Sequence, residues 1–387
     1  MSSFTPPKRH RCFLNAALQA EKVYDAFHRF LARITGRLGK PMAAEIYFAI
    51  RHRTAVSVKG RVLLARKWRH PHVDDHALIN LFQMLSRWVT PERPYSLVRA
   101  SAGGASIEQR ADREGYFEID LPLHEIHSDE VLIELPESEV SMPSHWEILS
   151  PGNEGRCLII SDIDDTVLIT HAAKLLRMLA TTFFGNALTR QLFPGTATLY
   201  RALQAGPEEG LCRANPLAYV TSSPFNLHGL LYLIFKENDL PVGAFFMTDW
   251  GLHEDRWLTR SHRDHKLDAI RKVLSWYPDM PTILIGDSGQ HDTAIYIEAA
   301  LANPGVVTQI LIRQVSDDSR IEGLRAEVEK LTNSETRFSF FKDSDEAAAI
   351  LKEAGWISPD QREQVRLAIQ EAPPSLLDLM ANRRVGG

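Results

Sequence analysis

The sequence predicts an α/β protein whose parallel sheet follows a small antiparallel β-sandwich. From residue 151 on, apolar runs alternate with stretches of helical spacing; they span residues 158–160, 217–220, 242–247, 282–285 and 306–312. Strands that are apolar on both faces are typical of a parallel sheet covered by helices. Before residue 151, short segments alternate apolar and polar side chains with turn residues between them, which is typical of an antiparallel sheet.

The composition is that of a globular protein without a membrane span. The 387 residues are 44% hydrophobic, enough for at least one large core. We find neither an apolar stretch of about 20 residues nor a secretory signal pattern, and therefore expect a cytoplasmic protein. Cys12, Cys157 and Cys212 are few, odd in number and widely spaced, which argues against a disulfide framework or a thiolate metal site.

Residues 1–40 are predicted to form a basic amphipathic helix. They carry eight basic and two acidic side chains, a net charge of +6, although the whole chain has a net charge of -5. The apolar residues at helical spacing are Val23, Phe27, Phe30, Leu31, Ile34 and Leu38. Two interpretations stay open: residues 14–40 make a peripheral contact with an anionic membrane, or the helix packs on the protein's own body.

Residues 41–150 are predicted to form the sandwich as an accessory domain. The expected strands are 55–64, 104–108, 115–121 and 130–135, with a helical insertion at residues 76–89. The segment shows no catalytic motif, so we interpret it as a scaffold or as a docking module for a protein partner that the sequence does not identify.

Residues 151–342 are predicted to form the α/β domain, and residues 343–387 a C-terminal helical tail. The helical spacing of Ala347, Ile350 and Leu351, followed by a charged segment from Pro359 to Met380, predicts the tail helices. The tail has no functional interpretation.

Two apolar strands of the α/β domain end in carboxylates. Asp162, Asp164 and Asp165 follow the first strand, while Asp287 and Asp292 follow the run at 282–285. The carboxyl ends of parallel strands are where such sheets bind ligands, and acids gathered there repel one another unless a cation lies between them. Oxygen-only ligands predict Mg²⁺; a helix-loop-helix calcium site fits worse because its central glycine and closing glutamate are missing.

Two further polar elements accompany the acids. Thr221-Ser222-Ser223-Pro224 ends the strand at 217–220, and a hydroxyl followed by main-chain amides can hold a phosphate oxygen. Lys266 stands at the start of an amphipathic helix. Each feature alone is weak evidence for a phosphate site, because hydroxyl residues cap many helices and most lysines are surface charges.

In this order, the four elements resemble the haloacid dehalogenase superfamily. The motifs are D-x-D-x-T from Asp162 to Thr166, a hydroxyl at Thr221, Lys266, and G-D-x-x-x-x-D from Gly286 to Asp292. More narrowly, S-D-I-D-D-T, T-S-S-P-F and G-D-S-G-Q-x-D resemble the catalytic domain of the actin-patch type of phosphatidate phosphatase, a family distantly similar to lipins. This resemblance, over about residues 155–315, implies a Rossmann-like sheet of haloacid dehalogenase type.

The resemblance also implies residue roles. Asp162 is expected to be the nucleophile that forms an aspartyl phosphate, and Asp164 the general acid and base. Thr221, with Ser222 as the next candidate, is expected to bind a phosphoryl oxygen. Lys266 is expected to be catalytic as well as phosphate-binding, because it would balance the charge on the transferring phosphoryl group. The implied Mg²⁺ ligands are Asp162, the main-chain carbonyl of Asp164, Asp287, and Asp292 directly or through water. Thr293-Ala294 stand where the family commonly has a proline and an acid.

About 30 residues separate Asp164 from Pro194, too few for a large cap domain, so we expect an open site. Residues 175–184 either form an apolar lip suited to a lipid or a helix that covers the sheet. Phe225, Trp250, Leu252 and Trp257 are candidates to extend that lip.

The resulting expectation is a Mg²⁺-dependent phosphomonoesterase acting on phosphatidate or a related lipid phosphate. The alternatives are a phosphatase for soluble sugar or nucleotide phosphates and, third, a non-catalytic adaptor. The adaptor would have lost a nucleophile, acid or metal ligand, and all are present. We expect no nucleic-acid partner, because the body of the chain is acidic.

Overall fold

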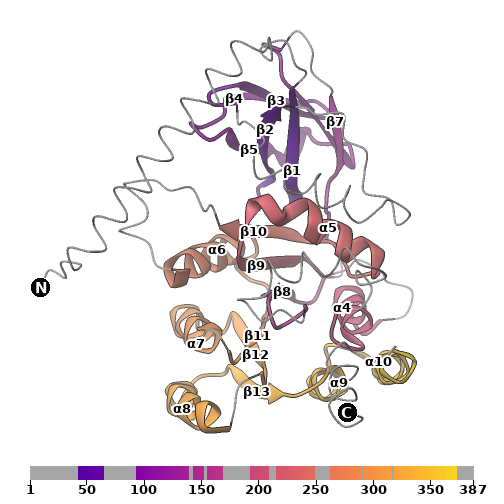
Figure 1. Cartoon of the computed structure of the whole chain (residues 1–387), viewed down its shortest axis with the longest axis vertical. Coiled ribbons are helices and arrows are strands. Elements are labelled where there is room, and N and C mark those ends of the chain that lie inside the picture. The colour runs from indigo at the N-terminus through magenta and orange to yellow at the C-terminus, as the bar shows by residue number, and fades with distance from the viewer. Residues whose placement is uncertain are drawn as a thin grey trace, which may run out of the picture.

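The computed structural model describes residues 42–64, 93–138, 143–151, 155–168, 192–208, 215–248, 262–289, 291–315 and 318–372. Within these residues the chain forms two antiparallel sheets near its N-terminal end, followed by a six-stranded parallel sheet (Figure 1). The predicted helix at residues 1–40, the insertion at 76–89 and the apolar segment at 175–184 lie outside the described residues.

The antiparallel unit is a sandwich of two sheets. One sheet has the order β1-β2-β5, with β1 at Met42–Arg51, β2 at Ala55–Leu64 and β5 at Tyr116–Pro122. The other has the order β4-β3-β6-β7, with strands at Ala105–Arg110, Leu97–Ala102, Glu130–Glu134 and Ser144–Glu147. Inward side chains of both sheets, such as Val58 and Val98, share one buried core. The predicted antiparallel architecture is thus confirmed.

Strand β1 is buried on both faces, and this explains why its sequence lacks a simple alternation. Ile46 and Ala49 belong to the sandwich core, whereas Tyr47, Phe48 and Ile50 belong to the core of the α/β unit. The pairing with β2 shifts between Ile46 and Phe48, a β-bulge. A bulge re-aims the side chains beside it, so that one strand can face two partners.

The parallel sheet has the strand order β10-β9-β8-β11-β12-β13. All five predicted runs become strands: β8 at Leu158–Ser161, β9 at Leu217–Pro224, β10 at Ala244–Thr248, β11 at Thr282–Asp287 and β12 at Val307–Arg313. The sixth strand, β13 at Arg337–Phe341, was not predicted. Every neighbouring pair runs parallel, which confirms the α/β class.

Helices cover the two faces of this sheet. On one side lie α6 at His262–Trp276, α7 at Asp292–Ala302 and α8 at Asp318–Val328 (Figure 1). On the other lie α4 at Thr196–Ala205, α9 at Ser344–Glu353 and α10 at Pro359–Glu371. The helix α5 at His228–Glu237 lies between the sheet and the sandwich. Short 3₁₀ turns occur at Leu123–Glu125, Phe225–Leu227 and Glu329–Leu331.

The C-terminal helices belong to the α/β core. Leu351 of α9 and Val365 of α10 are fully buried in the same cluster as the strands of the parallel sheet. Residues on both sides of the two predicted domain boundaries therefore share a core. The helices α9 and α10 pack with the α/β unit beyond the boundary at residue 342, and β1 packs with it from before the boundary at residue 150. The domain boundaries at these two positions stay predictions.

Candidate active site

The first acid cluster lies at the carboxyl end of β8, beside a buried lysine. The Lys266 ammonium, on α6, donates to Asp162 Oδ1 at 2.8 Å and to Asp292 Oδ1 at 2.6 Å. All three side chains are buried. A lysine so enclosed is rarely left without carboxylate partners, because burial of an unpaired charge is costly. Residues from three distant parts of the chain thus form one ion-pair group.

Asp287, at the end of β11, completes a three-carboxylate group. One oxygen each of Asp162, Asp287 and Asp292 lies within 4.8 Å of the others, and all three residues are buried. The main-chain N–H of Gly289 donates to Asp287 Oδ1 at 2.6 Å and orients that side chain. Three carboxylates at this separation are a donor set that fits a hard divalent cation.

Burial and charge set the pKa values of the central pair. Burial raises the pKa of Asp162 well above its ordinary value; Lys266 opposes this shift, whereas Asp292, Asp164 and Asp287 reinforce it. Burial lowers the pKa of Lys266, but the carboxylates of Asp162 and Asp292 outweigh burial and raise it overall. Lys266 therefore stays protonated at neutral pH. Any further positive charge beside the acids would favour their ionised forms.

The second part of the site is a pair of hydroxyls on Asp164. Thr221 Oγ1 donates to Asp164 Oδ2 at 2.6 Å, and Ser223 Oγ donates to the same oxygen at 3.0 Å. The Ser223 main-chain N–H in turn donates to Thr221 Oγ1 at 2.9 Å. Two donors on one oxygen hold the Asp164 carboxyl in a single orientation.

Ser223 is a site residue that the sequence motifs do not single out. The two candidates there were Thr221 and its neighbour Ser222, yet β9 extends to Pro224 and strand side chains alternate between the faces of a sheet. The side chains of Thr221 and Ser223, two residues apart on a strand, therefore point to the same face. This alternation is the signal in T-S-S that indicates Ser223 as the partner of Thr221. Ser222 lies between them, and its main-chain carbonyl accepts from Thr248 Oγ1 at 2.6 Å.

The remaining loop residues are supporting groups. Thr166 Oγ1 is 3.4 Å from Asp162 Oδ2, at the long end of a hydrogen bond. Asp165 adopts a left-handed conformation with φ 58°. A non-glycine residue rarely does so, and this marks a tight turn directly after Asp164.

The lip predicted around the site is only partly described. Phe225 does not extend it, because its ring is buried, stacks on Tyr47 at 4.4 Å and lies 5.3 Å from the ring of Tyr116. It packs instead between the α/β unit and the sandwich. Trp250, Leu252 and Trp257 lie outside the described residues.

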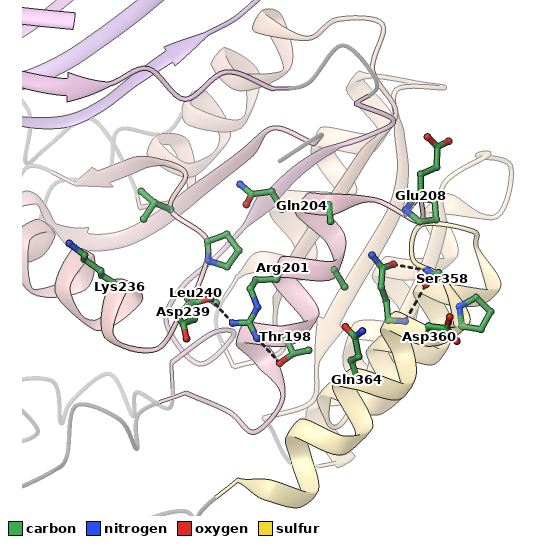
Figure 2. A pocket seen from close by; sticks show the side chains of 17 residues that line it. Thr198, Arg201, Gln204, Glu208, Lys236, Asp239, Leu240, Ser358, Asp360 and Gln364 are labelled. Atoms are coloured by element: carbon green, nitrogen blue, oxygen red, sulfur yellow. Dashed lines mark hydrogen bonds between the residues drawn. The ribbon is translucent and has the colours of Figure 1, made fainter. Parts of the chain in front are cut away.

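The α/β unit also carries a groove of about 1030 Å³, and Figure 2 shows the side chains that line it. It lies between α4, the turn that precedes β10 and the start of α10; Arg201 donates there to the Asp239 carbonyl at 2.8 Å. The lining includes the C-terminal part of α4, which leads toward β9, and residues 239–242, which lead into β10, so the groove lies at the amino ends of these strands, whereas the acids stand at the carboxyl ends. The groove contributes nothing to the acid cluster.

Comparison with known proteins gives one family. Residues 157–314 match the family described as phosphatidate phosphatase APP1, catalytic domain. Phosphatidate phosphatase APP1 of Saccharomyces cerevisiae is 28% identical over 159 residues, which is 41% of this chain and 26% of that protein. An uncharacterized protein of Schizosaccharomyces pombe is 26% identical over 244 residues, 58% of this chain and 38% of that protein.

The chain spans about a quarter to two fifths of the length of these curated relatives. Among solved structures, a carbohydrate acetylesterase from Xanthomonas citri matches with a TM-score of 0.28 and 9% identity, over 83% of this chain and 71% of that one. A similarity this low supports no argument.

Within the described part of the chain, no helix is both long and apolar enough to span a bilayer.

The matched segment begins just before β8 and ends just after β12. It therefore contains the D-x-D-x-T loop, Thr221, Lys266 and both acids of the G-D-x-x-x-x-D motif. The resemblance that the ordered motifs predicted is confirmed: residues 157–314 are similar to the catalytic domain of the APP1 type of phosphatidate phosphatase.

Proposed function

We propose that this protein is a Mg²⁺-dependent phosphomonoesterase that works through an aspartyl phosphate on Asp162. One observation carries the proposal: three buried carboxylates and a buried lysine converge within hydrogen-bond and metal-ligand distance at the carboxyl ends of parallel strands. The ordered motifs and the match to residues 157–314 support a sheet of haloacid dehalogenase type and the phosphatase reaction class.

In the first step, a carboxylate oxygen of Asp162 attacks phosphorus, and the bond from phosphorus to the ester oxygen breaks. The Asp164 carboxyl gives its proton to that leaving oxygen, so an alcohol departs. In the second step, the Asp164 carboxylate takes a proton from water, the water oxygen attacks phosphorus, and the bond to Asp162 breaks. Inorganic phosphate is released and both aspartates return to their starting state.

The residues that would hold Mg²⁺ are Asp162, Asp287, the main-chain carbonyl of Asp164, and Asp292 directly or through water. The ion would supply positive charge that favours the ionised form of Asp162 and offsets the charge on the phosphoryl oxygens. Lys266 holds Asp162 and Asp292 in place and adds a second positive charge beside the transferring group.

Thr221 has two tasks in this scheme. Its single hydroxyl proton is donated to Asp164, so the predicted bond to a phosphoryl oxygen requires that proton to turn away from Asp164 when an ester binds. Ser223 would then keep Asp164 oriented. Ser222 is retained as the second candidate for the phosphoryl oxygen.

The proposed substrate is phosphatidate or a related lipid phosphate, reached by a cytoplasmic protein that contacts the membrane peripherally through residues 14–40. The names of the matched family and of the budding-yeast relative support this choice. The second candidate is a soluble sugar or nucleotide phosphate. The absence of space for a large cap between Asp164 and Pro194 favours an open site that either substrate can reach.

Phosphate release from a panel of phosphomonoesters tests the activity. The panel contains phosphatidate and lysophosphatidate in mixed micelles, together with sugar and nucleotide phosphates. We expect phosphatidate to be hydrolysed fastest with Mg²⁺, and Asp162→Asn to lose at least about 10³-fold in kcat, as removal of a nucleophile does. Faster hydrolysis of a soluble ester would replace the lipid assignment, and full activity of the variant would end the nucleophile assignment.

Vesicle co-sedimentation tests the membrane contact separately. We expect the chain to sediment with vesicles rich in anionic lipid and to be released by salt, because basic side chains near a surface are screened. Neutral substitutions at Arg29, Arg33 and Arg37 should weaken this binding without changing hydrolysis of a soluble ester. A chain that stays in the supernatant at low salt would contradict the contact.

A further inference from the structure

Arg313, the last residue of β12, is a buried cation beside the acid loops. Its side chain is 2% exposed. Nε donates to the main-chain carbonyl of Thr166 at 3.0 Å, and Nη1 donates to the carbonyl of Lys342 at 3.4 Å. The guanidinium lies over the rings of Phe193 and Phe341, 4.1 Å and 4.8 Å from the ring centroids. Thr166 closes the D-x-D-x-T motif, so this side chain supports the first acid loop directly.

The main chain of the same residue supports the second acid loop. The Arg313 carbonyl accepts from the N–H of Ser288 at 2.9 Å, and Ser288 directly follows Asp287. Two residues further on, the N–H of Val315 donates to Ser288 Oγ at 3.0 Å. Arg313 therefore bonds both loops that bring carboxylates to the site, one through its guanidinium and one through its backbone.

The contact with Phe193 adds a third segment. The Phe193 N–H lies 3.4 Å from the carbonyl of Val167, directly after Thr166. The chain that returns to the sheet before α4 is thus fixed to the D-x-D-x-T loop and to the guanidinium that supports it. Planar stacking on aromatic rings and a fork of donors are properties of arginine that lysine lacks.

A charge at this depth is costly for folding. Burial lowers the pKa of Arg313 to about 10, against opposing contributions from Tyr200 and Asp343, so the side chain still carries its proton at neutral pH. An apolar residue could fill the same space without this cost. The guanidinium instead donates to two main-chain carbonyls, one in the D-x-D-x-T loop at Thr166 and one after β13 at Lys342.

We propose that Arg313 is a positioning residue that holds the Asp162 loop and the Asp287 loop at the separation a shared divalent cation requires. The inference rests on the proposed function only in that the two loops bind one ion. Outer groups that orient metal ligands commonly change metal affinity or activity by about 10–100-fold when they are removed.

The test is the affinity of the full-length chain for Mn²⁺ alone, measured by electron paramagnetic resonance, with kcat and KM for a soluble ester as a second readout. Arg313→Met removes the charge and the fork, and Arg313→Lys keeps the charge. Arg337→Met, at the exposed start of β13, controls for loss of an arginine from the same sheet. Leu351→Ala, buried on α9, controls for loss of stability in the same core.

We expect Arg313→Met to weaken Mn²⁺ binding by about 10–100-fold and to lower kcat more than it raises KM. Arg313→Lys should retain more affinity than Arg313→Met, while Arg337→Met and Leu351→Ala should bind Mn²⁺ as the unchanged chain does. If Arg313→Met does not fold, the same comparison is made with Arg313→Lys, whose affinity should fall below that of Leu351→Ala.

Equal Mn²⁺ affinity in the Arg313 variants and in Leu351→Ala would overturn the inference, as would an unchanged chain that does not bind Mn²⁺. Failure of the proposed function looks different. In that case the unchanged chain binds Mn²⁺, Arg313→Met binds it more weakly, and no ester on the panel releases phosphate.

Discussion

The orientation of Asp164 depends on two hydroxyls that share one acceptor oxygen. Ser223→Ala removes the 3.0 Å bond and Thr221→Val the 2.6 Å bond. A hydrogen bond contributes about 0.5–1.5 kcal/mol, so each variant should lower kcat by about two-fold to tenfold. The free-energy losses of the two single variants should not add up to that of the double variant, because both donors serve the same oxygen. Steady-state kinetics on a soluble ester measures this.

Ser222→Ala is the matched control for the hydroxyl pair, since it removes a hydroxyl from the residue between them. We expect it to change kcat less than Ser223→Ala does. If Ser222→Ala proved the more damaging of the two, the assignment of Ser223 to Asp164 would be wrong and the original sequence-based choice would stand.

The buried acids make stability depend on pH and on metal. Burial is the main reason why the pKa of Asp162 is higher in the folded chain than in the unfolded chain. The resulting stabilisation is fully present below the ordinary carboxyl pKa of about 4, and it is lost as the pH rises through the pKa of Asp162 in the folded chain. Mg²⁺ favours the ionised carboxylates and opposes that loss. The denaturant midpoint with Mg²⁺ should therefore exceed the midpoint with EDTA by a margin that grows toward neutral pH.

Urea unfolding at several pH values, each with Mg²⁺ and with EDTA, measures that margin. Asp287→Asn is the control, because it removes one of the three carboxylates and should shrink the margin at neutral pH. A midpoint that Mg²⁺ leaves unchanged at every pH would mean that the three acids do not share an ion.

At the scale of elements, the end of β11 must approach the start of α7 closely. A Cβ added to Gly286 would lie 2.7 Å from Tyr296 Cε2 and 2.8 Å from Asp292 Oδ2. Such overpacking costs about 1–3 kcal/mol. Gly286→Ala should therefore lower the free energy of unfolding and displace Asp292 from Lys266, with a fall in kcat.

Gly323→Ala on α8 is the matched control, because an added Cβ there meets no atom within 4 Å. It should stabilise the helix by about 0.8–1.0 kcal/mol and leave kcat unchanged. Chemical unfolding and phosphate release are measured for both variants. Equal stability and equal kcat in Gly286→Ala and Gly323→Ala would show that β11 and α7 do not require a glycine at residue 286.

How far elements follow from the sequence depends on how many partners they face. β8 and β11 were predicted because both of their faces are buried in one core and both end in acids. β1 was not, because its two faces enter different cores and a bulge breaks the alternation. Arg313 gave no signal either, since a lone arginine after an apolar run does not reveal that Thr166 lies against it. Such contacts come from the tertiary fold.

At the scale of the whole molecule, β1 joins the sandwich to the α/β unit. Phe48 lies 5.3 Å from the ring of Phe246, His52 stacks on Trp276 at 5.0 Å, and Tyr277 donates to the Arg51 carbonyl at 2.8 Å. Neither unit can lose β1 without exposing part of its core. We therefore expect the two units to unfold in a single cooperative transition. Tryptophan fluorescence and far-ultraviolet circular dichroism should then give the same unfolding midpoint.

Tyr47→Ala tests this junction. It removes a 2% exposed ring that stacks on Phe225, two residues after Ser223, and large-to-small changes of aromatic residues cost about 3–5 kcal/mol. We expect both fluorescence and dichroism midpoints to fall together, with a loss of kcat because the turn after Ser223 loses its support. Two separate transitions in the unchanged chain would show that the sandwich is energetically independent.

The proposed mechanism requires Asp162 to be the nucleophile that attacks phosphorus, and trapping the phosphoryl group on that residue tests this role most directly. The full chain is mixed with radiolabelled phosphatidate and Mg²⁺, quenched in acid within one turnover and digested. We predict label on the peptide that contains Asp162 and none in Asp162→Asn. Turnover that continues at the unchanged rate in Asp162→Asn, or label that appears on another residue, would contradict the mechanism.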